Sequence, residues 1–459
     1  MHRFRRLLLL TTLLVLATSL TELWAQSSPA ITSWLINTNG TVARSYRLGN
    51  PTPIVDTAKA NVQLVRYNAT SAYINCSGLP SYITGPFNPN PAVATNNKNL
   101  FRIPLVPQPK TGTKTAVGMG NIGILINGVP IYNYADAFSY NNQNVWHQNA
   151  IVFENSGFDC SKAHPSPVRI NGVMVGGNYH HHQNPSAFSL STNPTSTVCS
   201  TYPSDGLYVP DSTRHSPLIG FAFDGYPIYG PYGYDLTTGT GPVVRIRPSY
   251  RLRNITARTS LPNGTALAAN QYGPTLATYA LGAYKEDFEY VASSGHLDES
   301  NGRFAVTPEY PQGTYAYYAT IEANGRSAFP YFIGDNYYGV VANDNFARPG
   351  STTTTSVVAP TTGLTTYVPT AIAGKQTSLV AKLYPNPAAD FVAVQVDDLM
   401  RKDATVELIT LDGKTLLTNT LTQGSTIAYL DTRTIYDGIY LVRVSSDQAT
   451  TVIRLVLNH

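Results

Sequence analysis

The chain has 459 residues with a formal net charge of +4, and only 13% of its residues are charged. That length accommodates about two or three domains with buried cores. The small, scattered charge excludes a nucleic-acid-binding surface, because no basic stripe is interleaved with aromatic residues. The abundant Gly, Pro and Tyr, at 35, 32 and 31 residues, favour short strands joined by many turns. We therefore expect a mainly β fold.

The N-terminus is typical of a signal peptide. A basic region precedes the run from Leu7 to Leu20, which is uncharged and contains only apolar and small hydroxyl residues. The Sec translocon recognises such a short apolar run, and the small residue Ala25 offers a cleavage position for signal peptidase. A membrane anchor needs about 20 apolar residues, and Glu22 follows this run closely. We expect residues 1–25 to be removed, leaving a mature chain without a transmembrane segment.

Residues 26–345 form one large β-rich domain in this interpretation. The segments Val62–Tyr67 and Ile122–Ile126 are β-branched and bounded by Asn, Gly and Pro, as strands are. The Asn127-Gly128 pair after the second segment is typical of a tight turn. Few stretches show helical periodicity, and no internal repeat of fixed period is evident.

Three cysteines belong to this domain, and exported proteins can keep disulfides. Cys160 and Cys199 flank a histidine-rich segment, so this pair is the preferred disulfide. That pairing leaves Cys76 as a buried thiol.

Histidines are concentrated between His164 and His215, and most densely in Tyr179–Gln183. If this stretch is extended, alternate side chains share one face. His180 and His182 would then project together, with Tyr179 and His181 on the opposite face. Two imidazoles at this spacing can bind one transition-metal ion.

Other residues could complete such a site. The turn-rich stretches around them place His164, His215 and Asp224 on loops that could converge on the histidine pair. Three or four nitrogen or oxygen ligands would make a site for zinc or copper. The alternative is a polar surface patch, with Asp224 only capping its turn. No glutamate is close to the cluster in sequence, so a general base would have to come from Asp159, Asp211 or Asp224.

The C-terminal part of the chain divides into a linker and a small domain. Residues 346–380 are rich in Thr and Pro and cannot bury enough apolar surface to offset the entropy of ordering. In residues 381–459, the alternation over Phe391–Val396 predicts a half-buried strand. Asp412-Gly413 predicts a hairpin, and the spacing of further strands indicates a small immunoglobulin-like β-sandwich.

Residues 381–459 resemble a known family of secretion signals. Leu383–Pro387, Asp412-Gly413 and Gly438–Tyr440, in that order, are similar to the type A sorting domain of type IX secretion in Bacteroidetes. The resemblance implies that the type IX machinery is a partner. It also implies that the protein is secreted or attached to the outer cell surface. An ordinary C-terminal sandwich that binds carbohydrate or protein is the alternative.

The preceding domain resembles the YHYH domain family. The resemblance rests on segments between about residues 115 and 340, chiefly Asn127–Asn133, Ala163–Pro165, Gly177–His182 and Asp224–Gly230. The name-giving Tyr-His-Tyr-His is Tyr179 to His182 here, so the inner tyrosine of the family is His181. The paired imidazoles are kept. The resemblance implies no particular activity, because none is established for the family. Metal binding is one interpretation of its motif.

Three functions are compatible with this sequence. The first is an exported protein that holds copper or zinc without assigned turnover. The second is an extracellular metalloenzyme, either hydrolytic through zinc-bound water or oxidative through copper. The third is a structural or adhesive surface protein whose histidines only hold loops together. Neither a His-Glu-x-x-His helix nor a Gly-x-Ser-x-Gly elbow is present, so the sequence assigns no reaction.

Overall fold

A computed structural model describes most of the chain. The described residues are 28–88, 92–170, 172–186, 199, 201–202, 204, 206–342, 345, 356–369, 379–396, 402–411, 413–446 and 449–459. The expected signal peptide, residues 1–25, lies outside this part, as does most of the expected linker.

Strands dominate the described residues, so the expected mainly β fold is confirmed. The helices are single turns: α2 (Pro29–Thr32), α3 (Ala150–Phe153), and the 3-10 turns η1 (Tyr140–Asn142), η2 (Asn155–Gly157), η4 (Ala269–Gln271) and η5 (Lys285–Asp287). Within the described part of the chain, no helix is long and apolar enough to cross a membrane.

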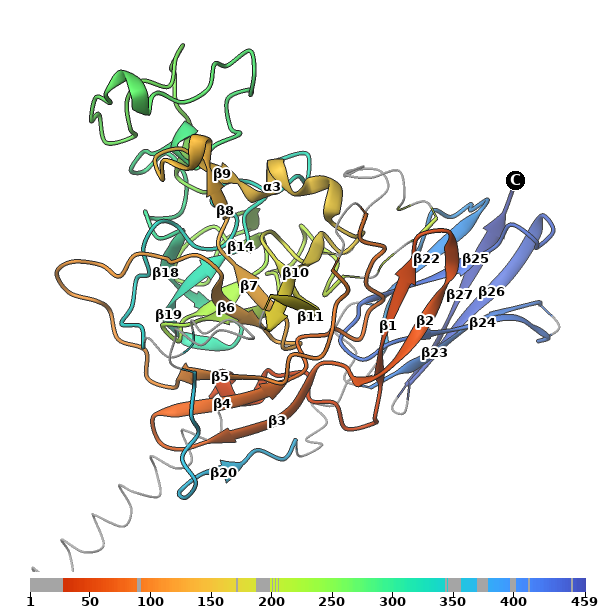
Figure 1. Ribbon diagram of the computed structural model, residues 1–459. Helices are drawn as coiled ribbons and strands as arrows, with labels where there is room; N and C mark the ends of the chain where they lie inside the picture. The colour runs from red at the N-terminus through yellow and green to blue at the C-terminus, as the bar shows by residue number, and fades with distance from the viewer. Residues whose placement is uncertain are drawn as a thin grey trace, which may run out of the picture.

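An eight-stranded sheet forms the centre of the molecule (Figure 1). Its strands, in spatial order, are β10 (Ala163–Ile170), β11 (Val173–His181), β7 (Pro130–Tyr132), β6 (Asn121–Leu125), β12 (Leu218–Ala222), β13 (Pro227–Tyr229), β19 (Tyr310–Tyr318) and β18 (Gly302–Thr307). Neighbours are antiparallel except β11 with β7 and β13 with β19. Every residue of β6 and β12 is buried, as expected for strands covered on both faces.

The predicted Asn127-Gly128 turn joins β6 to β7. Gly128 has a φ of 82° and its N–H donates to Leu125 O at 2.8 Å. A Cβ at Gly128 would lie 2.5 Å from Cys76 Cβ, so only glycine allows this approach. The turn therefore joins the central sheet to the neighbouring sheet at the buried Cys76.

A second sheet packs into the same core as the central one. Its strands are β20 (Thr365–Thr366), β3 (Val62–Tyr67), β4 (Ser71–Cys76) and β5 (Asn99–Pro104), in that order. β20 belongs to the stretch expected to be a linker, yet it pairs with the edge of β3. Strand pairing uses backbone groups and needs no apolar side chains, so a Thr-rich segment can join a sheet despite its composition.

Four two-stranded ribbons extend from these sheets. They are β1 (Val42–Arg47) with β2 (Asn50–Lys59), β8 (Ala135–Ser139) with β9 (His147–Asn149), β14 (Tyr232–Tyr234) with β15 (Val243–Arg245), and β16 (Tyr250–Leu252) with β17 (Phe288–Tyr290). The turn-rich segment between β16 and β17 is held by a buried ion pair. Arg258 Nε lies 2.7 Å from Asp287 Oδ1, and both side chains are inaccessible to solvent.

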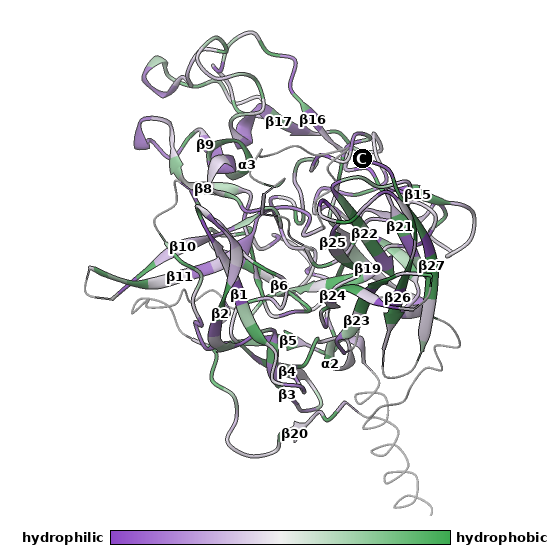
Figure 2. Cartoon of the chain, turned by 90° about the vertical axis from the view of Figure 1, so that its right-hand side faces the viewer, coloured by the Kyte–Doolittle hydropathy of each residue, from purple (hydrophilic) through white to green (hydrophobic). Residues whose placement is uncertain are grey.

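The C-terminal residues form a sandwich of two antiparallel sheets. One contains β21 (Ala381–Tyr384), β22 (Phe391–Val396) and β25 (Ile427–Asp431). The other contains β24 (Thr415–Leu421), β23 (Ala404–Ile409), β26 (Gly438–Ser445) and β27 (Thr450–Leu457). Both contribute to one apolar core, and Figure 2 shows apolar residues along these strands. The predicted strand at 391–396 is β22, and the predicted hairpin joins β23 to β24.

The turn between β24 and β25 docks this sandwich on the rest of the molecule. Gln423 Nε2 donates to Ile36 O at 2.9 Å, and Ser81 Oγ donates to Gln423 O. Val209 N donates to Thr426 Oγ1 at 3.0 Å. The turn thus contacts both the N-terminal segment and the region that follows the histidines.

Substituting Gly424 tests this docking. Gly424 has a φ of 83°, and a Cβ there would lie 2.6 Å from Leu35 Cδ1 in the buried core. Gly413 has a φ of 88° with nothing within 4 Å of such a Cβ. Both Gly→Ala variants incur the cost of a left-handed backbone, but only Gly424→Ala also overpacks a core, at about 1–3 kcal/mol. We expect Gly424→Ala to lower the thermal unfolding midpoint more than Gly413→Ala; equal midpoints would contradict the docking.

Candidate metal centre

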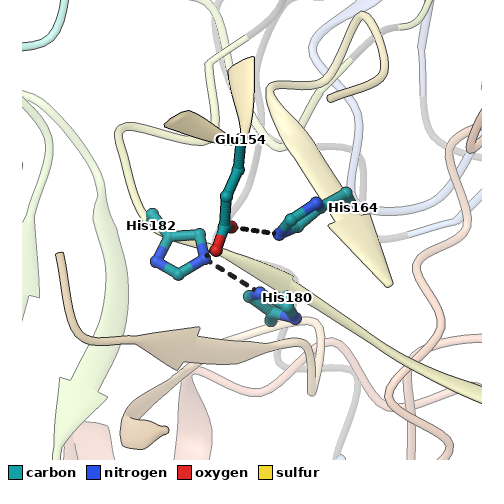
Figure 3. Close-up of side chains that lie close together, drawn as sticks. All are labelled: Glu154, His164, His180 and His182. Carbon is teal, nitrogen blue, oxygen red and sulfur yellow. Dashed lines mark hydrogen bonds and ion pairs between the residues drawn. The ribbon is translucent and has the colours of Figure 1, made fainter. Parts of the chain in front are cut away.

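Three histidines come together on the β10–β11 hairpin (Figure 3). His164 lies on β10 directly opposite His180 on β11, and His182 follows β11 by one residue. Residues opposite one another in an antiparallel pair point to the same face, and so do residues two apart on one strand. The alternation expected for His180 and His182 is therefore present, and His164 lies on a strand rather than on the expected loop.

A one-residue bulge sets this register. Near the turn Arg169 pairs with Met174, but the next pair is Val168 with Gly176, so Val175 has no opposite residue. A shift of one residue moves side chains to the other face of a strand. Without the bulge, His164 would lie opposite Tyr179 and would point away from His180.

Glu154 completes the cluster from a different segment (Figure 3). It ends α3, where its N–H donates to Ala150 O at 2.9 Å. Its Oε2 lies 2.8 Å from His164 Nε2 and 3.2 Å from His182 Nε2. One donor atom from each of the four residues falls within 4.8 Å of the others.

Hydrogen bonds to carbonyls fix the tautomers of two histidines. His180 Nδ1 lies 2.8 Å from Asn178 O, and His182 Nδ1 lies 2.6 Å from Asn133 O. Because a carbonyl can only accept, each Nδ1 carries the proton, and each neutral imidazole presents an unprotonated Nε2. The two Nε2 atoms lie 3.0 Å apart. When both imidazoles are neutral, two lone pairs therefore face each other in a buried site.

The electrostatics of His180, His164 and Glu154 favour the charge states that bind metal. Burial, together with the neighbouring His182 and His164, holds the pKa of His180 well below its usual range. Burial also lowers the pKa of His164. Burial alone would raise the pKa of Glu154, but His182 and His164 outweigh it and lower that pKa. Neutral imidazoles beside an ionised carboxylate are the forms in which these groups coordinate metal ions.

Aromatic packing restrains the imidazoles. The Tyr132 ring stacks on His180 with centroids 3.7 Å apart and planes 17° apart. The Phe158 ring meets His164 edge to face at 4.7 Å. Tyr132 also accepts a hydrogen bond from Asn178 Nδ2 at 2.7 Å. The ligand positions are thus set by packing as well as by the strands.

Tyr179 and His181 point to the opposite face of β11, as expected. His181 Nε2 lies 2.7 Å from Tyr82 Oη, and Tyr179 Oη donates to Asp159 Oδ2 at 2.9 Å. Burial and the nearby His182 lower the pKa of His181 to about 3. These two side chains support the hairpin from behind and take no part in the cluster.

His215 and Asp224 lie outside the cluster among the described residues. The centroid of the His215 ring lies 5.0 Å from the ring centroid of Tyr229 and 5.0 Å from that of Tyr234. Asp224 accepts hydrogen bonds from Tyr317 Oη at 2.6 Å and Gly339 N at 2.9 Å. Both are committed to packing near β13 and β19, so the expected convergence on His180 and His182 is replaced by Glu154.

Sequence reasoning missed Glu154. It comes ten residues before His164, at the end of the short apolar run Ala150–Phe153. Of the acids considered instead, Asp159 bonds Tyr179 behind the hairpin and Asp211 pairs with Arg214. The sequence offers one weak signal for Glu154 as a member of the cluster. It is an acidic residue just before the turn that leads into a strand with a histidine.

Cys160 and Cys199 form a disulfide, the pair preferred from the sequence, and Cys76 is a buried free thiol. Burial raises the pKa of the Cys76 thiol to about 12, so it stays protonated and unreactive. The disulfide joins the segment before His164 to the region beyond His182.

Comparisons with known proteins identify two segments. The family described as "YHYH protein" matches residues 100–329, half of the chain, and includes all four residues of the cluster. The family described as "Secretion system C-terminal sorting domain" matches residues 382–458, the C-terminal sandwich. No curated protein matches the chain.

The pH dependence of stability tests the environment of His215. Burial lowers its pKa from 6.5 to about 4. Below pH 6.5 the unfolded chain therefore binds more protons here than the folded protein, so stability falls as the pH decreases toward about 4. Against a His215→Asn variant, the wild type should lose about 3 kcal/mol of unfolding free energy between pH 7 and pH 4. If the unfolding free energies of the two proteins, measured with urea, changed equally between pH 7 and pH 4, the lowered pKa of His215 would be contradicted.

Thiol counting tests the disulfide. Without reductant, the unfolded chain should expose one reactive thiol, from Cys76, and after reduction it should expose three. A Cys160→Ser/Cys199→Ser variant should unfold more easily by about 4 kcal/mol, since the closed loop spans 39 residues and restricts the unfolded chain. Three thiols without reductant would rule out the bond.

Proposed function

Because this chain belongs to the YHYH protein family and ends in a type IX secretion sorting domain, we propose that it is an exported metal-binding protein. The sorting domain makes it a secreted or outer-surface protein that the type IX machinery recognises. The proposed ligands of one copper or zinc ion are Glu154, His164, His180 and His182. We also expect signal peptidase to remove residues 1–25 after entry through the Sec translocon.

The facing Nε2 atoms of His180 and His182 carry this proposal. When both imidazoles are neutral, their acceptor lone pairs, 3.0 Å apart in a buried site, repel each other unless a proton or a metal ion lies between them. Four donors bound to a tetrahedral ion at about 2.0–2.1 Å lie roughly 3.3 Å from one another. The closest separations in the cluster, 2.8 to 3.2 Å, need little adjustment to reach that spacing.

The donor set favours copper or zinc over other ions. Imidazole nitrogen suits zinc, copper, iron and nickel, whereas calcium and magnesium prefer oxygen ligands. An exported site must load and keep its metal outside the cytoplasm, which disfavours the easily oxidised ferrous ion.

Holding the ion suits this geometry better than turnover. A closed zinc site has four protein ligands, whereas a catalytic one keeps a position for water or substrate. All four donors here come from the protein. The metalloenzyme alternative requires one of them to leave.

A purely structural role is the second alternative. In that case a proton replaces the metal, and one protonated imidazole donates to its neighbours. A proton turns only one of the two facing Nε2 atoms into a hydrogen-bond donor, whereas a metal ion is bound by all four groups at once. The two cases differ in measurable metal content.

Metal analysis of the purified mature protein separates these functions. We expect one copper or zinc ion per chain, absent from a His180→Ala/His182→Ala variant and retained in His215→Asn. Bound metal should also raise the unfolding temperature of the wild type but not that of the double variant. Metal content at background level, with unchanged stability in the double variant, would falsify the proposal.

A further inference from the structure

The four ligands differ in their access to solvent. His180, His182 and His164 are 1%, 4% and 7% exposed. The side chain of Glu154 is 22% exposed. Its Oε2 atom is itself buried and points into the cluster, so the rest of the side chain makes up the exposed part. Glu154 is therefore the most solvent-exposed of the four ligands.

The ligands also differ in how firmly the chain holds them. The hairpin that carries the histidines has eight cross-strand pairs, and two imidazoles are bonded to backbone carbonyls. Glu154 lies between the single turns α3 and η2, and among the described residues its backbone bonds only to Ala150 and Gly157 of those turns. Figure 3 shows it reaching the imidazoles from a ribbon separate from theirs.

We propose that Glu154 is the exchangeable ligand of the metal, an inference that rests on the proposed metal site. Its carboxylate oxygen leaves the ion, and a small monodentate donor, water or a small anion, binds in its place. One metal–oxygen bond breaks and one bond to the incoming donor forms, without any change in oxidation state. The three histidines keep the ion during the exchange.

The exchange gives the centre an open position at its most exposed ligand. Three histidine ligands would hold the ion while the incoming donor takes the fourth position. The released carboxylate stays next to this position, where it can accept a proton from a bound water or other protic molecule. We therefore infer that the incoming molecules are small anions and small protic molecules, because displacing a single side chain frees only a small space.

Azide binding to the copper-loaded mature protein tests this. In the wild type, azide must displace Glu154 and should bind weakly, giving a saturable charge-transfer band at one azide per copper. In Glu154→Ala the position is already open, so azide should bind at least tenfold more tightly while copper is retained. Glu154→Gln, which keeps the side-chain volume, should fall between the two. Glu289→Ala, which removes a carboxylate elsewhere in the domain, should match the wild type.

The outcomes separate the two proposals. Absence of copper from the wild type contradicts the metal site itself. Copper in the wild type, with equal azide affinity in all four proteins, overturns only the role of Glu154. Loss of copper from folded Glu154→Gln also overturns it, because the carboxylate would then be as necessary as the histidines. Circular dichroism of each variant establishes folding beforehand.

Discussion

The one-residue bulge of the β10–β11 hairpin determines whether the His164, His180, His182 and Glu154 side chains can form one cluster. Strand periodicity places His180 and His182 on one face of β11, but it leaves the face of β10 undetermined. Val175, the residue without an opposite partner, brings His164 into line with His180. Tyr179 and His181 then face inward to Tyr82 and Asp159. A single extra residue thus sorts the polar side chains of the hairpin into a ligand face and a supporting face.

The structural features that depend on local sequence patterns were predicted correctly. The shared face of His180 and His182 follows from their spacing. The turn at Asn127-Gly128 follows from residues that tolerate a positive φ. The C-terminal sandwich follows from alternating strands and from motifs with a known order. In the first two cases the determining interactions lie within a few residues of one another.

Prediction from the sequence failed for side chains whose position depends on packing between distant segments. His164 and His215 both lie in turn-rich sequence, so nothing local separates a ligand from a packed ring. In the structure, β10 takes His164 to the cluster, whereas tyrosines of β13 and β14 surround His215. Glu154 reaches the cluster from the segment between α3 and η2, and no spacing rule encodes its contact with the hairpin histidines. The pairing of Thr365 and Thr366 with β3 was likewise not predicted, because composition does not reveal an open strand edge.

The disulfide gives the chain a closed covalent ring. The ring from Cys160 to Cys199 contains His164, His180 and His182, while Glu154 lies outside it. A single backbone cut anywhere in the ring therefore leaves both fragments joined, and the three imidazoles stay on one covalently connected molecule. Complete loss of one of these histidines from the molecule by cleavage inside the ring therefore requires two cuts, or one cut together with reduction of the bond.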